Sequence, residues 1–182
     1  YATQRWHVFP CHSIRNGGCS CGEAKCARQG KHPRTQHGWK DATIDPAVIR
    51  DWWTRWPDAH VTVATGPSLL DLVDVDAPLG EESLEAFEGR NGKLPDTVSS
   101  LTGGGGIHFF YQANGRRLPE GQDTLGRQID TKGVTGYALL PPSSHISGRR
   151  YEWNAEAHPD DVELAVLPDK VYDAANRRDT EA

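Results

Sequence analysis

The sequence lacks methionine altogether and has no apolar run close to the ~20 residues that a membrane-spanning helix needs. Its first residues do not show the basic segment followed by an apolar one that is typical of a secretory signal peptide. These absences exclude a helical membrane anchor in this sequence, and we expect a cytoplasmic protein with no membrane partner. Because no initiator methionine is present, we expect the sequence to be a fragment that begins within its first helix, Tyr1 to Trp6.

A surplus of basic residues is also missing, since 25 acidic residues against 20 Lys and Arg give a net charge of −5. That sign is unusual for a nucleic-acid-binding protein, but the distribution is uneven. Five basic residues and no acid lie between Lys25 and Lys40, whereas acids gather at 41–51, at 71–88 and from 160 onward. A protein with a separate basic region can still bind phosphate groups there, so the net charge does not exclude nucleic-acid binding.

With 182 residues, 36% of them hydrophobic, and six tryptophans, the chain can bury a core without covalent cross-links. Its length suits one domain, or one domain with a small appended module. The residues from Ala155 onward are acidic and rich in alanine. We therefore expect residues 155–182 to form an acidic, partly helical tail, in which residues 162–167 can dock and residues 173–182 form a frayed helix.

Residues Leu69 to Asp76 have the pattern of a buried strand that ends in two acids. Side chains two positions apart on a strand face the same way, so Asp74 and Asp76 share a face while Val73 and Val75 pack behind them. Two such carboxylates repel each other unless a cation lies between them. Mg²⁺ prefers carboxylate oxygens together with substrate phosphates, which suits this pair. The alternative is that both acids are simply solvated at a polar turn.

All four cysteines fall in residues 11–26, in a stretch without hydrophobic periodicity that cannot pack a core of its own. Two disulfides or free thiols are alternatives. The near adjacency of two of the cysteines, the interleaved histidines and the missing export signal favour a closed structural Zn²⁺ site. Such a site would order the basic loop Gly30–Arg34. The expected ligands are Cys19, Cys21, Cys26 and His12, with Cys11 and His32 as alternatives to His12.

Hydrophobic periodicity predicts a helix that Thr43 or Asp45 caps and that ends at Pro57, with Pro46 in its first turn. Its apolar stripe consists of Val48, Ile49, Trp52, Trp53 and Trp56, and the tryptophans are expected to be core rather than a stacking platform. A second helix is expected over 81–89. Strands are expected at 6–10 (where Pro10 stops the strand), 61–65, 69–76, 98–101, 107–111, 126–130, 136–140 and 151–153.

Two further segments carry polar groups next to strands. Four glycines at 103–106 allow backbone N–H groups to approach a ligand, but they match neither the dinucleotide fingerprint nor the P-loop. Strand parity directs His108 away from Ile107 and Phe109, toward a polar surface, although a structural role is the alternative. At 143–145, Ser-Ser-His follows two prolines and offers donors for phosphate. A nucleophilic hydrolase is disfavoured because neither serine lies in a Gly-x-Ser-x-Gly motif.

Ten segments in order carry a resemblance to a known family: Trp6–Pro10, Cys19–Pro33, Trp39–Thr43, Trp52-Trp53, Ala64–Gly66, Val73–Asp76, Thr102–His108, Asp130–Gly133, Gly136-Tyr137 and Pro141–His145. Together they resemble the N-terminal primase–polymerase (prim-pol) domain of bifunctional replication proteins, in the archaeo-eukaryotic primase superfamily. The resemblance runs from Trp6 to about Trp153. Asp71 departs from it, because the family strand is usually apolar there, as does Val134-Thr135, where an acidic residue and glycine are more usual.

The resemblance implies an α+β fold with an RRM-like catalytic sheet, an N-terminal α/β unit and an inserted zinc-binding loop at 11–34, all within a catalytic domain at 1–154. It implies that Asp74, Asp76 and Asp130 bind catalytic Mg²⁺ or Mn²⁺. It also implies that the nucleotide phosphates contact Lys31, His108, Ser143 and His145. The expected partners are single-stranded or primed DNA, a dNTP or rNTP, and a helicase region that would follow this domain.

These expectations amount to a DNA primase/polymerase that transfers nucleotides by two-metal chemistry. One rival is a catalytically inactive, zinc-dependent nucleic-acid-binding module from a mobile-element replication protein. Another is a metal-dependent phosphohydrolase that uses the same acids. The presence of all three acids argues against the inactive module, and the two enzymes differ in whether pyrophosphate or phosphate leaves the nucleotide.

Overall fold

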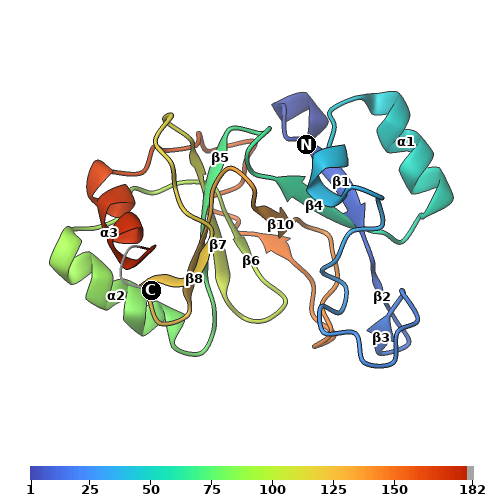
Figure 1. The fold of residues 1–182 in the computed structure, drawn as a ribbon, viewed down its shortest axis with the longest axis horizontal. Helices are drawn as coiled ribbons and strands as arrows, with labels where there is room; N and C mark the ends of the chain where they lie inside the picture. Colours follow the sequence, from blue (N-terminus) through green and yellow to red (C-terminus); the bar gives the residue numbers. More distant parts are fainter. Residues whose placement is uncertain (180–182) are drawn as a thin grey trace.

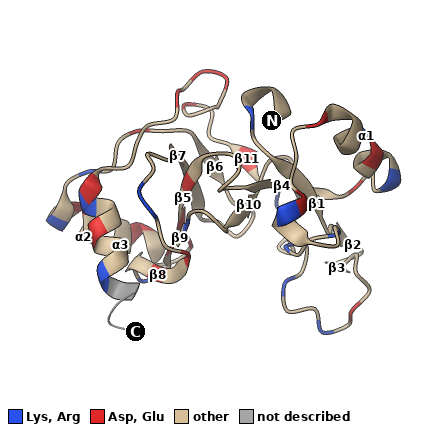
Figure 2. Ribbon diagram, turned by 45° about the horizontal axis from the view of Figure 1, so that its top comes forward, with Lys and Arg blue, Asp and Glu red and all other residues tan. Residues whose placement is uncertain are grey.

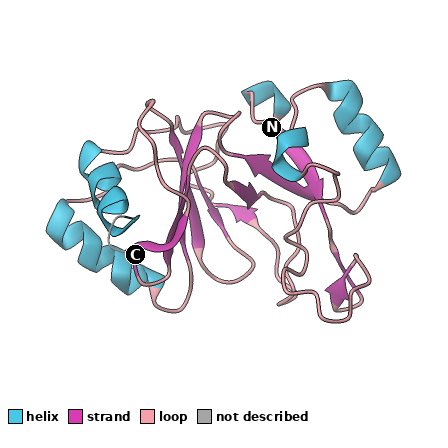
Figure 3. Cartoon of the chain, viewed as in Figure 1, coloured by secondary structure: helices cyan, strands magenta, loops and turns pink. Residues whose placement is uncertain are grey.

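The computed structural model describes residues 1–179, which form a mixed α+β protein with two main β-sheets flanked by helices and a small two-stranded sheet within residues 14–19 (Figure 1, Figure 3). The helices are α1 (Pro46–Arg55), α2 (Gly80–Asn91) and α3 (Asp169–Asp179), with short 3-10 helices η1 (Ala2–Gln4) and η2 (Gly38–Asp41). The strands are β1 (Val8–Cys11), β2 (Ile14–Arg15), β3 (Gly18–Cys19), β4 (His60–Ala64), β5 (Leu70–Val75), β6 (Ser99–Leu101), β7 (Ile107–Gln112), β8 (Gly121–Gly126), β9 (Ile129–Lys132), β10 (Tyr137–Leu139) and β11 (Glu152–Trp153). Within this part of the chain, no helix is both long and apolar enough to cross a bilayer.

The larger sheet has the strand order β11-β6-β7-β5-β9-β8, and every neighbouring pair is antiparallel. Its central strand β5 is buried along its whole length, which is why its sequence is largely apolar. The register places Asp74 of β5 opposite His108 of β7 on one side and Asp130 of β9 on the other. Three polar residues that are distant in sequence therefore form one row across the sheet.

The smaller sheet has the order β1-β4-β10 and packs against one face of the larger sheet. Leu70 and Leu72 of β5 meet Val8 and Val63 of the smaller sheet in a shared apolar core. Asp74 lies on the same face of β5, one step further along the strand. The apolar contact between the sheets thus gives way to a polar region at the end of β5.

Helices α2 and α3 cover the opposite face of the larger sheet (Figure 1). Val73 and Val75 of β5 pack there against Phe87 of α2 and Val171 of α3, and all four side chains are buried. This confirms the prediction that the valines lie behind the acids. Because apolar packing fixes one face of β5, the positions of the acids on the other face are fixed as well.

Helix α1 begins as the sequence predicts. The Asp45 side chain caps it by accepting a hydrogen bond from the Ala47 N–H, and Pro46 occupies the first turn. Its apolar stripe is only half-buried, since none of the residues of α1 is fully buried and Val48 is exposed. The expectation that the tryptophans are core is therefore too strong: Trp52, Trp53 and Trp56 are half-buried, and α1 lies on the outside of the smaller sheet.

Two strand boundaries differ from the expected ones. The first strand continues through Pro10 to Cys11. Pro10 of β1 lies opposite Val61 of β4, at a position where no backbone N–H is needed from it. The expected strand at 126–130 begins only at Ile129, and Gln128 has a positive φ of 60° in the turn before it. The polar segment that forms β8 was not expected to be a strand, since its hydrophobic alternation is weak.

The segment after Ala155 is part of the main core and not a separate tail. Leu167, Val171, Tyr172 and Ala175 are all buried in the core cluster beside β5. The helix begins at Asp169, before the expected start at residue 173, and its described part ends at Asp179. The last three residues of the expected frayed helix, 180–182, lie outside the described residues.

Candidate active site and metal centre

Three carboxylates converge at the end of β5. Asp74 and Asp76 come from β5 and the residue after it, and Asp130 comes from the neighbouring strand β9. One oxygen from each lies within 4.8 Å of the others, a separation that a single bound cation can span. We refer to these three residues as the acidic group. The shared face of Asp74 and Asp76 and the proximity of Asp130 follow from strand parity and register.

Asp74 is the most buried member, with 8% of its surface exposed. Burial by itself raises the pKa of Asp74, but His108 and Lys132 outweigh that effect and hold the pKa below its usual range. Lys132 Nζ lies 2.6 Å from Oδ2, and His108 Nε2 lies 3.4 Å from Oδ1. Asp74 is therefore ionised at neutral pH.

Asp76 and Asp130 experience the opposite effect. Burial raises the pKa of Asp76, and the charges of Asp74 and Asp130 raise it further. Burial also raises the pKa of Asp130, although its Oδ1 accepts a hydrogen bond from the Asp123 N–H at 3.0 Å. Three acids with this much mutual repulsion are a costly arrangement without a counter-charge.

Three carboxylates that repel one another form a suitable ligand set for a divalent cation such as Mg²⁺ or Mn²⁺. Oδ1 of Asp74 is buried and forms no hydrogen bond among the described residues, with His108 Nε2 nearby at 3.4 Å, so it can serve as a ligand atom. A cation between the carboxylates would satisfy that oxygen and relieve the repulsion that raises the pKa of Asp76.

A cavity of 330 Å³ lies in front of the acidic group. The larger sheet lines it with the three acids and His108, and the smaller sheet lines it with Tyr137 of β10. Its third wall is the segment after β3, which contributes Arg28 and Lys31. This segment carries the basic stretch seen in the sequence (Figure 2). The cavity is therefore acidic on one side and basic on the other.

His108 faces this cavity, as its strand parity predicts, but it is almost fully buried. Its ring packs against Tyr151 at 5.7 Å between centroids, and its Nδ1 atom has no hydrogen-bond partner within the described chain. Nε2 is the atom that faces Asp74. A ring held on both sides can donate from a fixed position, which suits contact with an anionic ligand.

The two candidate phosphate contacts of the segment Pro141–His145, Ser143 and His145, lie in different surroundings. Ser143 is buried, and its Oγ bonds to the backbone N–H and carbonyl of Val61, so this hydroxyl is engaged in holding the segment to β4. His145 is only partly buried, and burial together with the positive charges of Lys31 and Arg149 lowers its pKa. His145 thus lies in the basic surroundings of the cavity, whereas Ser143 serves as an anchor.

The glycine run packs closely against the site. A Cβ on Gly106 would lie 2.2 Å from the Val75 carbonyl oxygen, and one on Gly103 would lie 2.2 Å from the His145 Cβ. Glycine at these two positions lets the β6–β7 connection pass between β5 and the 141–145 segment. Gly104 lines the cavity, so only part of the run has the ligand-facing role that its composition indicates.

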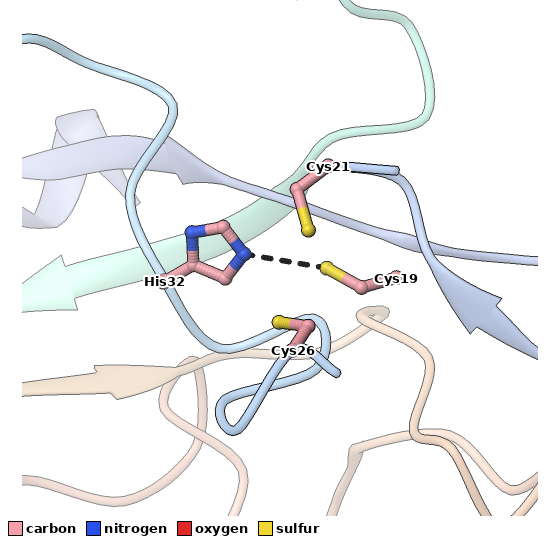
Figure 4. Close-up of side chains that lie close together, drawn as sticks. All are labelled: Cys19, Cys21, Cys26 and His32. Carbon is pink, nitrogen blue, oxygen red and sulfur yellow. Dashed lines mark hydrogen bonds between the residues drawn. The ribbon is translucent and has the colours of Figure 1, made fainter. Parts of the chain in front are cut away.

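A second group of ligand-type atoms lies in the loop that contains β3. The side chains of Cys19, Cys21, Cys26 and His32 point toward one another, with their ligand atoms within 4.8 Å (Figure 4). Three thiols and an imidazole form the donor set of a closed tetrahedral Zn²⁺ site. Burial raises the pKa of Cys19, but the N–H groups of Gly30 and Cys21 outweigh this and lower it to about 6, which favours the thiolate.

His32, and not the expected His12, completes this Cys/His group. His32 Nε2 lies 3.3 Å from Cys19 Sγ, whereas His12 Nδ1 lies 3.1 Å from Ser20 Oγ and its ring stacks on His32 at 4.3 Å. The other alternative, Cys11, is buried in the core of the smaller sheet. Pairing of β2 with β3 folds the loop back, and this long-range geometry cannot be deduced from ligand spacing.

Three residues of the site escaped the sequence analysis: Lys132, Arg28 and Tyr137. Lys132 could have been found, because it is two positions from Asp130 on the same strand and must share its face. Arg28 Nη2 donates to the Tyr137 hydroxyl at 2.7 Å, across 109 positions of sequence. A contact between a coreless loop and the outer strand of the smaller sheet has no local signal.

A family model described as the N-terminal domain of bifunctional DNA primase/polymerase matches residues 1–170 of the chain. That range includes the acidic group, the Cys/His group and every residue that lines the cavity. The chain belongs to the prim-pol family. Membership confirms the resemblance found in the sequence and indicates a primase/polymerase type of nucleotidyltransferase with DNA and nucleotides as substrates.

Proposed function

We propose that this prim-pol chain is an active catalytic domain that transfers nucleotides from a dNTP or rNTP to a primer 3′-hydroxyl, or to an initiating nucleotide, on a DNA template. The observation that carries the proposal is the polarity of the cavity, which is lined by three carboxylates at the end of β5 and by Arg28 and Lys31 from the segment after β3. A triphosphate with its metal ions needs both kinds of wall at once. A site for DNA alone would need only the basic one.

Asp74, Asp76 and Asp130 are the proposed ligands of the catalytic Mg²⁺ or Mn²⁺. The chemistry that such ions supply when bound is activation of the attacking hydroxyl and stabilisation of the leaving pyrophosphate. The contribution of the chain is to hold three ionised oxygens in one place. Lys132 supports this by pairing with Asp74, which keeps that carboxylate ionised and oriented.

Lys31, His108 and His145 are the proposed contacts of the nucleotide phosphates. Each lies at or beside the cavity, and each can donate a hydrogen bond to a phosphate oxygen. His108 occupies the deepest position, between the acidic group and Tyr151. The expected fourth contact, Ser143, is proposed instead to act indirectly by fixing the segment that carries His145.

The Cys/His group is proposed to bind a structural Zn²⁺. The loop between Cys19 and His32 contains both Arg28 and Lys31 and has almost no apolar residues of its own. Closing it through four ligands would fix the basic wall of the cavity without taking part in the chemistry.

We further interpret the larger sheet as RRM-like. The order β5, α2, β6, β7 and then β9 along the chain, with β5 and β7 central and β6 and β9 on either side of them, supports this interpretation. The ligand-bearing ends of the central strands then face the smaller sheet, where the cavity lies.

The experiment that separates this proposal from its rivals is an analysis of what leaves the nucleotide. The purified chain is incubated with primed single-stranded DNA, dNTPs and Mn²⁺, and released pyrophosphate and phosphate are measured separately. The proposal predicts pyrophosphate in equal amount to incorporated nucleotide. Free phosphate without incorporation would indicate a phosphohydrolase, and DNA binding with neither product would indicate the inactive binding module.

A further inference from the structure

His60 lies at the start of β4, outside the cavity lining, and joins two segments that reach the cavity from different directions. Its Nδ1 lies 2.8 Å from the carbonyl oxygen of Gly30, in the loop between Cys19 and His32, which we call the Cys/His loop. Its Nε2 lies 2.8 Å from the Ser144 hydroxyl and 3.2 Å from the Ser144 N–H, in the 141–145 segment. The ring is 3% exposed, so water does not compete for these bonds.

The hydrogen-bond partners determine the state of the imidazole. The Gly30 carbonyl can only accept, so Nδ1 must carry a proton, and the Ser144 N–H can only donate, so Nε2 must be unprotonated. His60 is therefore a neutral ring that donates to one segment and accepts from the other. Burial lowers the pKa of His60, in keeping with the neutral state.

Each of the two bonded residues is followed directly by a proposed phosphate contact. Lys31 follows Gly30, and His145 follows Ser144. The contact between His60 and Gly30 is close-packed. A Cβ on Gly30 would lie 3.0 Å from the His60 ring and 2.9 Å from the Ile14 side chain, and Gly30 has a φ of +68° that glycine favours.

The next residue of β4 strengthens the same junction. Ser143 Oγ bonds to both the N–H and the carbonyl of Val61, so the 141–145 segment is fixed to β4 at two consecutive residues. On the side of the Cys/His loop, Gly30 is held to the start of β4 by the hydrogen bond between its carbonyl and His60 Nδ1. His60 thus ties Gly30 to β4, while the Tyr137 hydroxyl of β10 donates to the Lys31 carbonyl at 3.3 Å and accepts from Arg28.

We propose that His60 is a positioning residue, which sets the distance between the Cys/His loop and the 141–145 segment so that Lys31 and His145 grip the same triphosphate. This inference rests on the proposed function, because it assumes that a nucleotide triphosphate enters the cavity. His60 itself touches no substrate. Its effect is on where Lys31 and His145 lie before the nucleotide arrives.

Three variants test the proposal. His60→Phe keeps the ring volume and removes both hydrogen bonds. His60→Asn keeps a polar atom at the position of Nδ1 and so restores the bond to Gly30 alone. Val63→Ala is the matched control, because it weakens β4 from the core between the sheets and leaves both segments' hydrogen bonds intact.

The first readout is amide hydrogen exchange in the full chain, which needs no activity. His60→Phe should increase exchange in residues 28–34 and 143–149, and His60→Asn should return residues 28–34 toward the wild-type rate. Val63→Ala should lower the melting temperature without a selective change in these two segments. Unchanged exchange in both segments of His60→Phe would overturn the proposal, whether or not the wild-type chain incorporates nucleotides.

The second readout is the Kd for dATP with Mn²⁺, alongside KM and kcat where incorporation is measurable. Misplacing Lys31 and His145 together should raise the dATP Kd and the KM on the order of tenfold in His60→Phe, with kcat changed less than about twofold. Kd should be unchanged in Val63→Ala. An equal loss in both variants would show that His60 acts only through stability, whereas absence of incorporation by the wild-type chain would count against the proposed function instead.

Discussion

The three carboxylates of the acidic group respond differently to their surroundings. Asp74 is kept ionised by Lys132 and His108, whereas the pKa values of Asp76 and Asp130 are raised by burial and by neighbouring negative charge. Without cations the group therefore lowers the stability of the fold, and with cations it becomes a binding site. Catalytic sites commonly carry such a cost.

Replacing Asp76 by Asn tests this relation. The variant loses one repulsive charge, so its melting temperature without metal should be no lower than that of the wild-type chain. The increase in melting temperature that Mn²⁺ causes in the wild-type chain should be lost, and incorporation should fall on the order of 100-fold or more. Glu81→Gln, an exposed acid at the start of α2, is the control. Full activity in Asp76→Asn would contradict the ligand assignment.

Asp71 is a second buried acid of β5, on the helix-covered face. The Tyr172 hydroxyl donates to its Oδ2 at 2.6 Å, yet burial raises its pKa above the usual value. An acid whose pKa is higher in the folded state binds protons more tightly there. Its contribution to stability is therefore present below about pH 4 and is lost as the pH rises through the folded-state pKa.

The Asp71→Asn variant should show this pH dependence directly. The melting temperature of the variant minus that of the wild-type chain should become more positive as the pH rises from 4 to 7, because only the wild-type chain must ionise a buried group. Thermal melts at several pH values measure it, with Asp51→Asn on exposed α1 as the control. A difference that does not change with pH would show that Asp71 titrates normally.

At this residue scale, local rules predicted part of the site. Strand parity alone placed Asp74 and Asp76 on one face of their strand and turned His108 away from Ile107 and Phe109, since a period of two depends on nothing beyond the strand itself. The same rule applies to Lys132. The choice of His32 over His12, and the anchoring role of Ser143, depend on how loops close in space. No local pattern reports that closure.

At the scale of elements, the Cys/His loop stands apart because it has almost no apolar residues with which to pack a core. The loop supplies Arg28 and Lys31 to the cavity, and its order is proposed to come from Zn²⁺. Loss of the metal should therefore change nucleotide binding while the two sheets remain folded.

The zinc assignment is tested by comparing His32→Ala with His12→Ala. The first should lose bound zinc, measured as metal content per chain, and should increase the KM for dNTP because Lys31 is no longer fixed. The second should retain zinc, since His12 only stacks on His32. Loss of zinc in His12→Ala with retention in His32→Ala would reverse the assignment of the fourth ligand.

Helix α3 is the element for which the sequence was least informative. Its acidic, alanine-rich composition predicted a tail, yet three of its side chains, Val171, Tyr172 and Ala175, are 0% exposed. The apolar positions are spaced three to four apart, which is a helical stripe, but it is too short to stand out from the polar residues around it. Tertiary packing decides its structure.

The Tyr172→Ala variant measures the contribution of α3. Removing a fully buried aromatic side chain should lower the free energy of unfolding by about 3–5 kcal/mol. Asp173→Ala, one residue further along, removes only surface ion pairing with Arg116 and should cost about 1 kcal/mol or less. Urea denaturation compares the two. Equal, small losses would indicate that α3 does not belong to the cooperative unit.

For the molecule as a whole, two sheets meet through an apolar core at one end and enclose a polar cavity at the other. The change occurs along β5, from Leu70 and Leu72 to Asp74, on one face of one strand. The alternation along β5 could be read from the sequence, and so could the α+β class. The second sheet that closes the cavity, and the loop that forms its basic wall, required the structure because they are joined only by long-range contacts.

The most direct test of the central claim is template-directed synthesis by the purified chain. Primed and unprimed single-stranded DNA are incubated with labelled nucleotides and Mn²⁺, in the wild-type chain and in Asp74→Ala. An active catalytic domain should give products whose sequence follows the template and that disappear in Asp74→Ala, with products on unprimed DNA if the chain also starts strands. DNA binding without any product, or products that persist in Asp74→Ala, would contradict it.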